Sequence, residues 1–249
     1  MRVRLPKPLH GWREFAGEVV IIVLGVLIAL VAGQVAQSLQ EHQTARETRV
    51  AVRAEVAAGL ASLALRQRAE PCIARRLSEI RQIVDRWGQS GSYATPSWIG
   101  AVPTFGVSLA RYDAANTAGR LAPLSSDEQY SLGVLAFGLR AFADLQSQEA
   151  EQWARLRMLR SGAAALSETD RANIRVALQE AQLLDYRAKL SVRQFIAFAA
   201  RLGIHPDFST LKQRARLTWK STDVKPSVCS SMTTPSDVAN ANQIVPIPE

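Results

Sequence analysis

Cysteine and histidine are scarce in this chain, and their scarcity argues against most metal and thiol chemistry. The two cysteines, Cys72 and Cys229, are far apart, and neither belongs to a CxxC pair. The three histidines, His10, His42 and His205, stand alone, so no zinc-ligand spacing arises. We therefore expect no metal ion and no cofactor.

Short motifs of nucleotide binding and hydrolysis are also missing. The chain contains no GxxxxGK[ST], GxGxxG, GxSxG or HExxH sequence. A fold can still assemble an active site from residues that are distant in sequence, so the absence lowers the expectation of an enzyme without excluding one. We predict that the protein is not an enzyme, and a hydrolase with an unrecognised site is the least favoured alternative.

The composition is that of a folded protein with a modest excess of arginine. Of the 249 residues 47% are hydrophobic and 21% are charged, which is ordinary for a globular chain. The net charge of +8 is spread along the sequence. A general excess of this kind does not require a polyanionic partner, and no nucleic-acid partner is expected.

One hydrophobic run near the N-terminus is long enough to reach across a bilayer. The unbroken run Val19 to Gly33 has 15 residues and would span only about 22 Å, short of a hydrocarbon core of about 30 Å. Extending it from Phe15 to Ala36 gives 22 residues and about 33 Å. We therefore predict a transmembrane helix over residues 15–36, with the lipid bilayer as a partner.

A cleaved signal peptide is the alternative explanation of the same run. Val31, Ala32 and Gly33 supply small residues at which a peptidase could cut. Against cleavage, the segment before the run is long and contains Pro6 and Pro8, and helix-compatible residues continue without a break after it. The uncleaved anchor is favoured, and the alternative stays open.

The distribution of basic residues predicts the orientation. Lys and Arg concentrate close before the span, whereas the first ones after it lie farther from the membrane. The prediction is a single-pass protein of the bacterial inner membrane, with residues 1–14 cytoplasmic and the following domain periplasmic. The basic residues are Arg2, Arg4, Lys7 and Arg13 before the span, and Arg46, Arg49 and Arg53 after it.

Small residues recur within the span at helical spacing. Gly25, Ala29 and Gly33 follow one another every four residues and share one face, which would let a second helix approach closely. A homodimer through this face is one interpretation. Chance spacing in a span rich in Ala and Gly is the other.

The remainder of the chain has the periodicity of helices. We predict a helix from about 34 to 68, a new helix starting at Pro71 and ending near Gly88, a long loop over 88–104 and a short helix over 105–117. Apolar positions recur at spacings of three and four in the longer segments.

Two start signals predict a pair of long helices in the second half. Ser125 is followed by Glu128, and Ser167 by Asp170, both of which are N-terminal capping patterns. The two helices, joined by a short connection, should form an antiparallel hairpin.

The predicted fold class is therefore mainly α: a single N-terminal transmembrane helix followed by an antiparallel helical bundle. The bundle occupies residues 37–220. Residues 221–249 are rich in Ser, Thr, Pro and Asn, which predicts a flexible C-terminal tail.

The two cysteines are predicted to pair. An even number of cysteines in a domain assigned to an oxidising compartment favours a disulfide, here between Cys72 and Cys229, that would hold the tail to the bundle. Two unrelated thiols are the alternative, and a cytoplasmic domain would favour it.

The N-terminal sequence WREFAGEVVIIVLGVLIALVAGQVAQSLQEHQTARE and the later stretch SLARYDAANTAGRLAPLSSDEQYSLGVLAF carry a resemblance. They resemble a family of uncharacterised bacterial single-pass membrane proteins that join an IVLGVLIAL-type anchor to a helical domain. The resemblance implies this architecture and no catalytic residues. Gln and Ala after the span depart from the Asn, Trp and Glu of the family pattern.

Two hypotheses of function from different classes follow from this architecture. The first is a membrane-anchored, non-enzymatic interaction or scaffolding module with an unknown cell-envelope partner. The second is a sensor-like domain that binds a small molecule between its helices, with Trp98, Tyr112 and Trp153 as the ligand-facing aromatics.

Overall fold

A computed structural model describes residues 12–209 together with residues 228 and 232. Within this part of the chain all regular secondary structure is helical, which confirms the predicted fold class, and four α-helices pack as a bundle. Two short 3-10 turns join the last two helices. The elements are α1 (Trp12–Ser90), α2 (Ala110–Thr117), α3 (Ser126–Leu156), η1 (Arg157–Ser161), η2 (Ala163–Ala165) and α4 (Glu168–Arg201).

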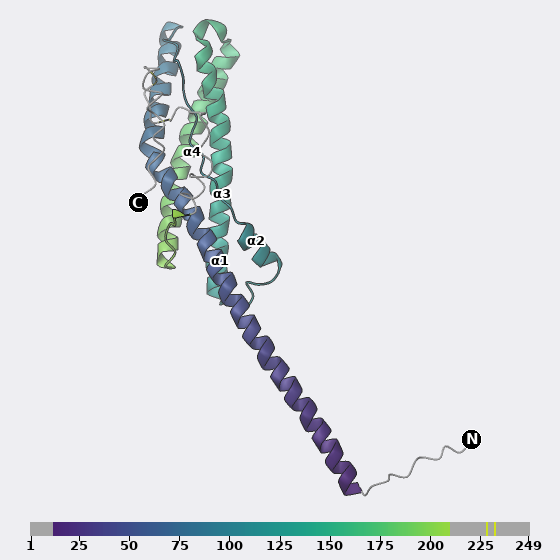
Figure 1. Cartoon of the computed structure of the whole chain (residues 1–249). Coiled ribbons are helices and arrows are strands. Elements are labelled where there is room, and N and C mark those ends of the chain that lie inside the picture. The colour runs from purple at the N-terminus through teal and green to yellow at the C-terminus, as the bar shows by residue number, and fades with distance from the viewer. Residues whose placement is uncertain (1–11, 210–227, 229–231, 233–249) are drawn as a thin grey trace, which may run out of the picture.

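Helix α1 has two parts with different surroundings. Its N-terminal part projects alone from the bundle, and the helix then turns along α3 and α4 (Figure 1). Val52, only 1% exposed, is the first residue of the described chain that the bundle buries. The apolar segment that precedes it has no protein neighbour to cover it.

The predicted break at Pro71 is wrong, because α1 continues through it as one helix of 79 residues. A proline inside a helix removes one hydrogen bond and costs about 3 kcal/mol. Pro71 lies on the exposed face of α1, so the carbonyl group that loses its bond can be hydrated. The buried residues Ala69 and Ile73 hold the helix against the bundle on either side of it.

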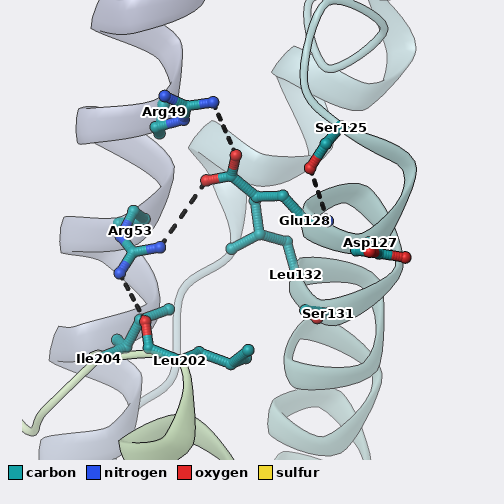
Figure 2. A pocket seen from close by; sticks show the side chains of 9 residues that line it. All are labelled: Arg49, Arg53, Ser125, Asp127, Glu128, Ser131, Leu132, Leu202 and Ile204. Atoms are coloured by element: carbon teal, nitrogen blue, oxygen red, sulfur yellow. Dashed lines mark hydrogen bonds and ion pairs between the residues drawn. The ribbon is translucent and has the colours of Figure 1, made fainter.

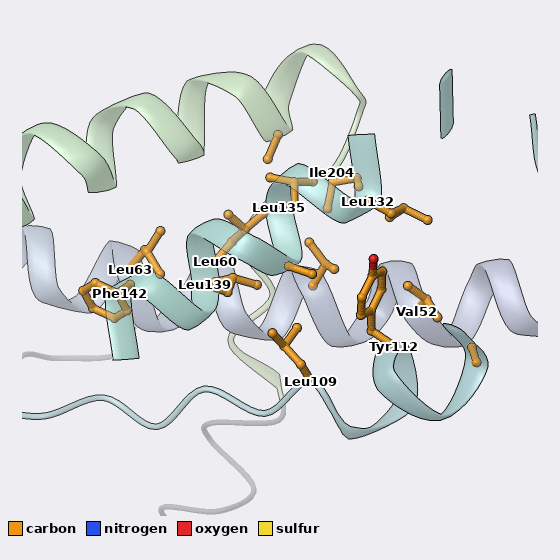
Figure 3. Close-up of a cluster of buried hydrophobic side chains, with 14 of the residues drawn as sticks. Val52, Leu60, Leu63, Leu109, Tyr112, Leu132, Leu135, Leu139, Phe142 and Ile204 are labelled. Carbon is orange, nitrogen blue, oxygen red and sulfur yellow. The ribbon is translucent and has the colours of Figure 1, made fainter. Parts of the chain in front are cut away.

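Two hydrophobic clusters fill the bundle. The first surrounds Leu60 and Leu139 at the end where α1 enters (Figure 3). The second lies at the far end, around Ile73, Trp153 and Ile174. Both clusters draw on α1, α3 and α4, so the three long helices form one body.

The two predicted capping signals are present. Ser125 accepts a hydrogen bond from the backbone N–H of Glu128, and Ser167 forms a reciprocal capping box with Asp170. Helices α3 and α4 then pack closely as the predicted hairpin. A Cβ atom placed on Gly138 of α3 would lie 2.1 Å from the ring of Phe195 of α4, so glycine allows this close crossing and a larger residue would force Phe195 or a helix to shift.

An irregular strap connects α1 to α2 and lies along the bundle. Helix α1 extends to Ser90 and α2 begins only at Ala110. The observed connection, 91–109, therefore starts later and is longer than the predicted loop over 88–104. Arg76 donates to the carbonyl of Ile99 at 2.6 Å. Gln146 accepts from the backbone N–H of Phe105 and donates to its carbonyl. Side chains of α1 and α3 thus fix the strap at its middle and near its end.

Candidate functional site

The small residues of the apolar span lie on an open helix face. Gly25, Ala29 and Gly33 are all exposed. A Cβ atom at Gly25 or Gly33 would meet no other atom within 4 Å. Nothing in the described part of the chain packs against this face, so its role in helix association stays a prediction.

The three aromatics of the sensor hypothesis are not brought together. Tyr112 belongs to the first hydrophobic cluster and Trp153 to the second. Trp98 sits in the strap, with the guanidinium of Arg76 4.5 Å from its ring. All three are buried, and they line neither of the bundle clefts described below. Their positions correspond to core and strap packing.

Of the two cysteines only Cys72 is described. It is half-buried in α1 and packs against the second hydrophobic cluster, as do Val228 and Met232. Cys229 lies outside the described residues, so its pairing with Cys72 stays a prediction. The described residues on either side of Cys229 nevertheless reach the cluster that Cys72 contacts.

A cleft of about 480 Å³ opens where α1 joins the bundle (Figure 2). Glu128 of α3 points toward two arginines of α1: its carboxylate lies 2.8 Å from Arg49 and 3.7 Å from Arg53. Arg53 also donates to the carbonyl of Leu202, just after α4, at 2.8 Å. The cleft therefore joins α1, α3 and the end of α4 through one charge network.

The sequence alone does not predict this cleft, although it contains one feature that points to it. Arg49 and Arg53 are four residues apart and so share a face of α1, at the level where burial begins. Glu128 satisfies both guanidinium groups, which makes the network a joint between the projecting helix and the bundle.

A layer of buried charges lies between the two hydrophobic clusters. Arg66 of α1 donates to Glu149 of α3 and to Asp185 of α4, both at 2.9 Å. The side chains of Arg66, Glu149 and Asp185 are 2%, 0% and 7% exposed. Lys189 lies 3.2 Å from Asp185 and 3.5 Å from Glu70, which extends the layer to the surface.

Burial dominates the electrostatics of this layer. The pKa of Glu149 is raised to about 7, chiefly because burial removes water from its carboxylate; Arg66 opposes this rise, and the neighbouring Asp185 carboxylate adds to it. Glu149 Oε2, Arg66 Nε and Trp153 Nε1 have no hydrogen-bond partner among the described residues. A smaller cleft of about 220 Å³ reaches Asp185 from the surface, lined also by Arg81 and Gln182.

A signal for the charged layer did exist in the sequence. Arg66 falls seven residues before the buried Ile73, and Asp185 falls seven after Leu178 and seven before Val192. Each charge therefore occupies a position of the buried helical stripe. Which charges would meet could not be predicted, because the three helices contribute one residue each.

No family model, curated protein or solved structure matches this chain. No group of three or more His, Cys, Asp or Glu residues in the described ranges is arranged to hold a metal ion.

Proposed function

We propose that the protein is a membrane-anchored, non-enzymatic interaction or scaffolding module of a bacterial cell envelope. The observation that carries this proposal is the apolar first part of α1. Its most apolar stretch has a mean hydropathy of 2.8, and none of it is buried by the protein. Exposed apolar surface of this extent is covered in a functioning protein, and a bilayer is the partner that its length fits.

The continuity of α1 turns the anchor into a support. Residues 37–51 follow the span in the same helix and precede Val52, the first buried residue. Residues 37–45 of this stretch line a cleft together with residues 118–123, which follow α2, so this end of the bundle lies close to the end of the span. The joint formed by Arg49, Arg53 and Glu128 fixes the bundle to this stalk. Such an arrangement presents helix faces at a defined height.

The non-enzymatic part of the proposal is supported by how the charges are used. The buried carboxylates of Glu149 and Asp185 both pair with Arg66, so they serve the packing of three helices. At the joint, Glu128 pairs with Arg49 and Arg53 in the same way. Membership of the single-pass family that the N-terminal sequence resembles is part of the same proposal.

Reporter fusions test the anchor and its orientation. A reporter that is active only outside the cytoplasm should be active when fused after Glu249 and inactive when fused before Met1. The protein should also stay with the membrane during extraction at alkaline pH. A reversed reporter pattern would overturn the periplasmic assignment, and a mature N-terminus near Gln34 would establish the cleaved signal peptide instead.

Crosslinking in native membranes, followed by mass spectrometry, tests the interaction role. We expect crosslinks from the bundle to a second protein chain, with the full-length protein as bait. The proposal would be contradicted if no protein were crosslinked to the bundle and the purified chain instead catalysed a reaction that was lost on substitution of one of its bundle side chains.

A further inference from the structure

The outward face of α4 carries an apolar heptad repeat that the described part of the chain does not cover. Val176, Leu183 and Leu190 are 49%, 49% and 47% exposed, although each is a large aliphatic residue. They follow one another at intervals of seven, and the exposed Ala197 continues the series. Tyr186, 63% exposed, lies between two of them on the same face. Apolar residues repeated every seven positions are the pattern of a coiled-coil seam.

The corresponding face of α3 shows that this pattern is not general in the bundle. Its outward positions at intervals of seven are Tyr130, Phe137, Asp144 and Glu151, so the second half of that series is acidic. An acidic series cannot form a continuous apolar seam. The two helices therefore offer a matched pair of surfaces, one suited to helix association and one not.

We propose that the α4 seam, defined as Val176, Leu183, Tyr186, Leu190 and Ala197, packs against the same seam of a second copy of this chain as a parallel two-helix contact. This inference deepens the proposed function and rests on its anchor, because two copies held in one membrane by their N-terminal helices have their α4 helices running in the same direction. Anchoring thus excludes the antiparallel arrangement.

The charges that flank the seam fit a parallel pair. In a parallel coiled coil each residue just before a seam position meets the residue five positions later on the other helix. This rule places Arg175 beside Glu180 of the second copy, Gln182 beside Arg187, and Lys189 beside Gln194. One pair is of opposite charge and none is of like charge. Arg193 lies seven residues after Tyr186, so in a parallel pair it meets Arg193 of the second copy. Its contact of 3.4 Å with Glu70 of its own chain, which Lys189 shares at 3.5 Å, offsets part of this charge.

The C-terminal segment of the same chain is the main rival occupant of the seam. Its two described residues lie elsewhere: Val228 and Met232 pack against the second hydrophobic cluster, and Ser97 of the strap donates to the carbonyl of Met232 at 3.3 Å. These two described residues therefore lie against the second hydrophobic cluster and the strap.

A contact between one helix of each copy buries a small area and so has low affinity. The membrane anchor compensates for this low affinity. Tethering in a shared membrane raises the effective concentration of one α4 helix near another, which strengthens a weak contact without adding to it. The open face of Gly25, Ala29 and Gly33 on the apolar span would be available to the same pair of copies. The contact should therefore form in membranes and weaken on dilution in detergent.

Single cysteine variants of the full chain in native membranes test the seam. Leu183→Cys and Leu190→Cys should each give a covalent dimer on mild oxidation, several-fold more than Glu151→Cys on the matched face of α3. The unsubstituted chain, which carries Cys72 and Cys229, supplies the background. Equal dimer formation at 151 and 183, or a crosslink from Leu183→Cys only to another protein, would overturn the proposal.

A second variant separates the seam from the apolar span. Leu183→Glu with Leu190→Glu alters only exposed positions, so its circular dichroism should be unchanged while the dimer fraction in membranes falls several-fold. An unchanged dimer fraction would overturn the seam. Release of the chain by alkaline extraction would instead count against the anchor, so the failure of each proposal is seen separately.

Discussion

The guanidinium of Arg66 lies 2.9 Å from a carboxylate oxygen of Glu149 between the two hydrophobic clusters, where neither side chain is more than 2% exposed. Asp185 shares the same nitrogen of Arg66. Removing charges from water is costly, and the gain from pairing them depends on good geometry. The layer therefore fixes how α1, α3 and α4 align along their lengths, since a shift of any helix would leave a charge buried alone.

Replacement of Arg66 tests this dependence. Arg66→Met keeps much of the side-chain volume but leaves two carboxylates without their cation, so we expect the free energy of unfolding to fall by about 3 to 5 kcal/mol. The measurement is urea unfolding of the detergent-solubilised full chain, followed by circular dichroism.

Arg155→Ala is the matched control for that experiment. Arg155 pairs with Glu151 on the surface of α3, with both side chains about half exposed or more. Pairs of this kind contribute roughly 0.3 to 0.5 kcal/mol. Similar losses for the Arg66 and Arg155 variants would show that the buried layer does not hold the bundle together.

Acid should stabilise the bundle through Glu149. Its pKa is raised from 4.5 to about 7, so between these values the folded state binds a proton that the unfolded state releases. The contribution is fully present below about pH 4.5 and is lost as the pH rises through about 7. The full shift corresponds to on the order of 3 kcal/mol.

The Glu149→Gln variant isolates this contribution. The difference in unfolding free energy between the wild-type chain and the variant should change across that pH window and be flat above it. Asp170, whose pKa is lowered by its hydrogen bonds to Ser167, acts with the opposite sign and at lower pH. A pH-independent difference between the two proteins would refute the assignment to Glu149.

Local signals predicted much of the fold, and contacts between distant segments limited the rest. Ser125 and Ser167 begin helices as expected, because capping depends on residues three positions apart. The continuity of α1 at Pro71 could not be predicted, since it depends on contacts that the flanking residues make with other helices. The layer around Arg66 is of the same kind, because its partners come from two distant helices.

Two glycines of α3 provide a test of helix packing. Gly138→Ala would place a Cβ atom 2.1 Å from the ring of Phe195, so we expect a loss of about 1 to 3 kcal/mol as α3 and α4 separate or Phe195 moves. At Gly133 the nearest atom is 3.5 Å away, so alanine fits there. Because alanine also favours helix, Gly133→Ala should raise stability by up to about 1 kcal/mol. Thermal unfolding measures the stability of both variants. Equal changes in the unfolding temperature would contradict the close approach of the two helices at Gly138.

The last prediction is that Cys72 and Cys229 form a disulfide. Val228 is only 3% exposed, and Met232 packs on the cluster that Cys72 contacts, so the chain reaches that cluster on both sides of Cys229. A periplasmic bundle would be in an oxidising compartment, where such a pair persists. Closing a loop of roughly 157 residues should stabilise the fold by about 4 to 5 kcal/mol in the chain-entropy description, less any strain in the native bond.

Peptide mapping without reduction, on protein alkylated in intact membranes, tests the pairing directly. One linked peptide containing both cysteines is expected. Cys229→Ser should lower the unfolding temperature and expose Cys72 to alkylation, whereas the nearby Ser231→Ala should do neither. Recovery of Cys72 and Cys229 as separately alkylated thiols would rule out the bond. That result, combined with an active reporter after Glu249, would also show that an oxidising compartment alone does not pair these residues.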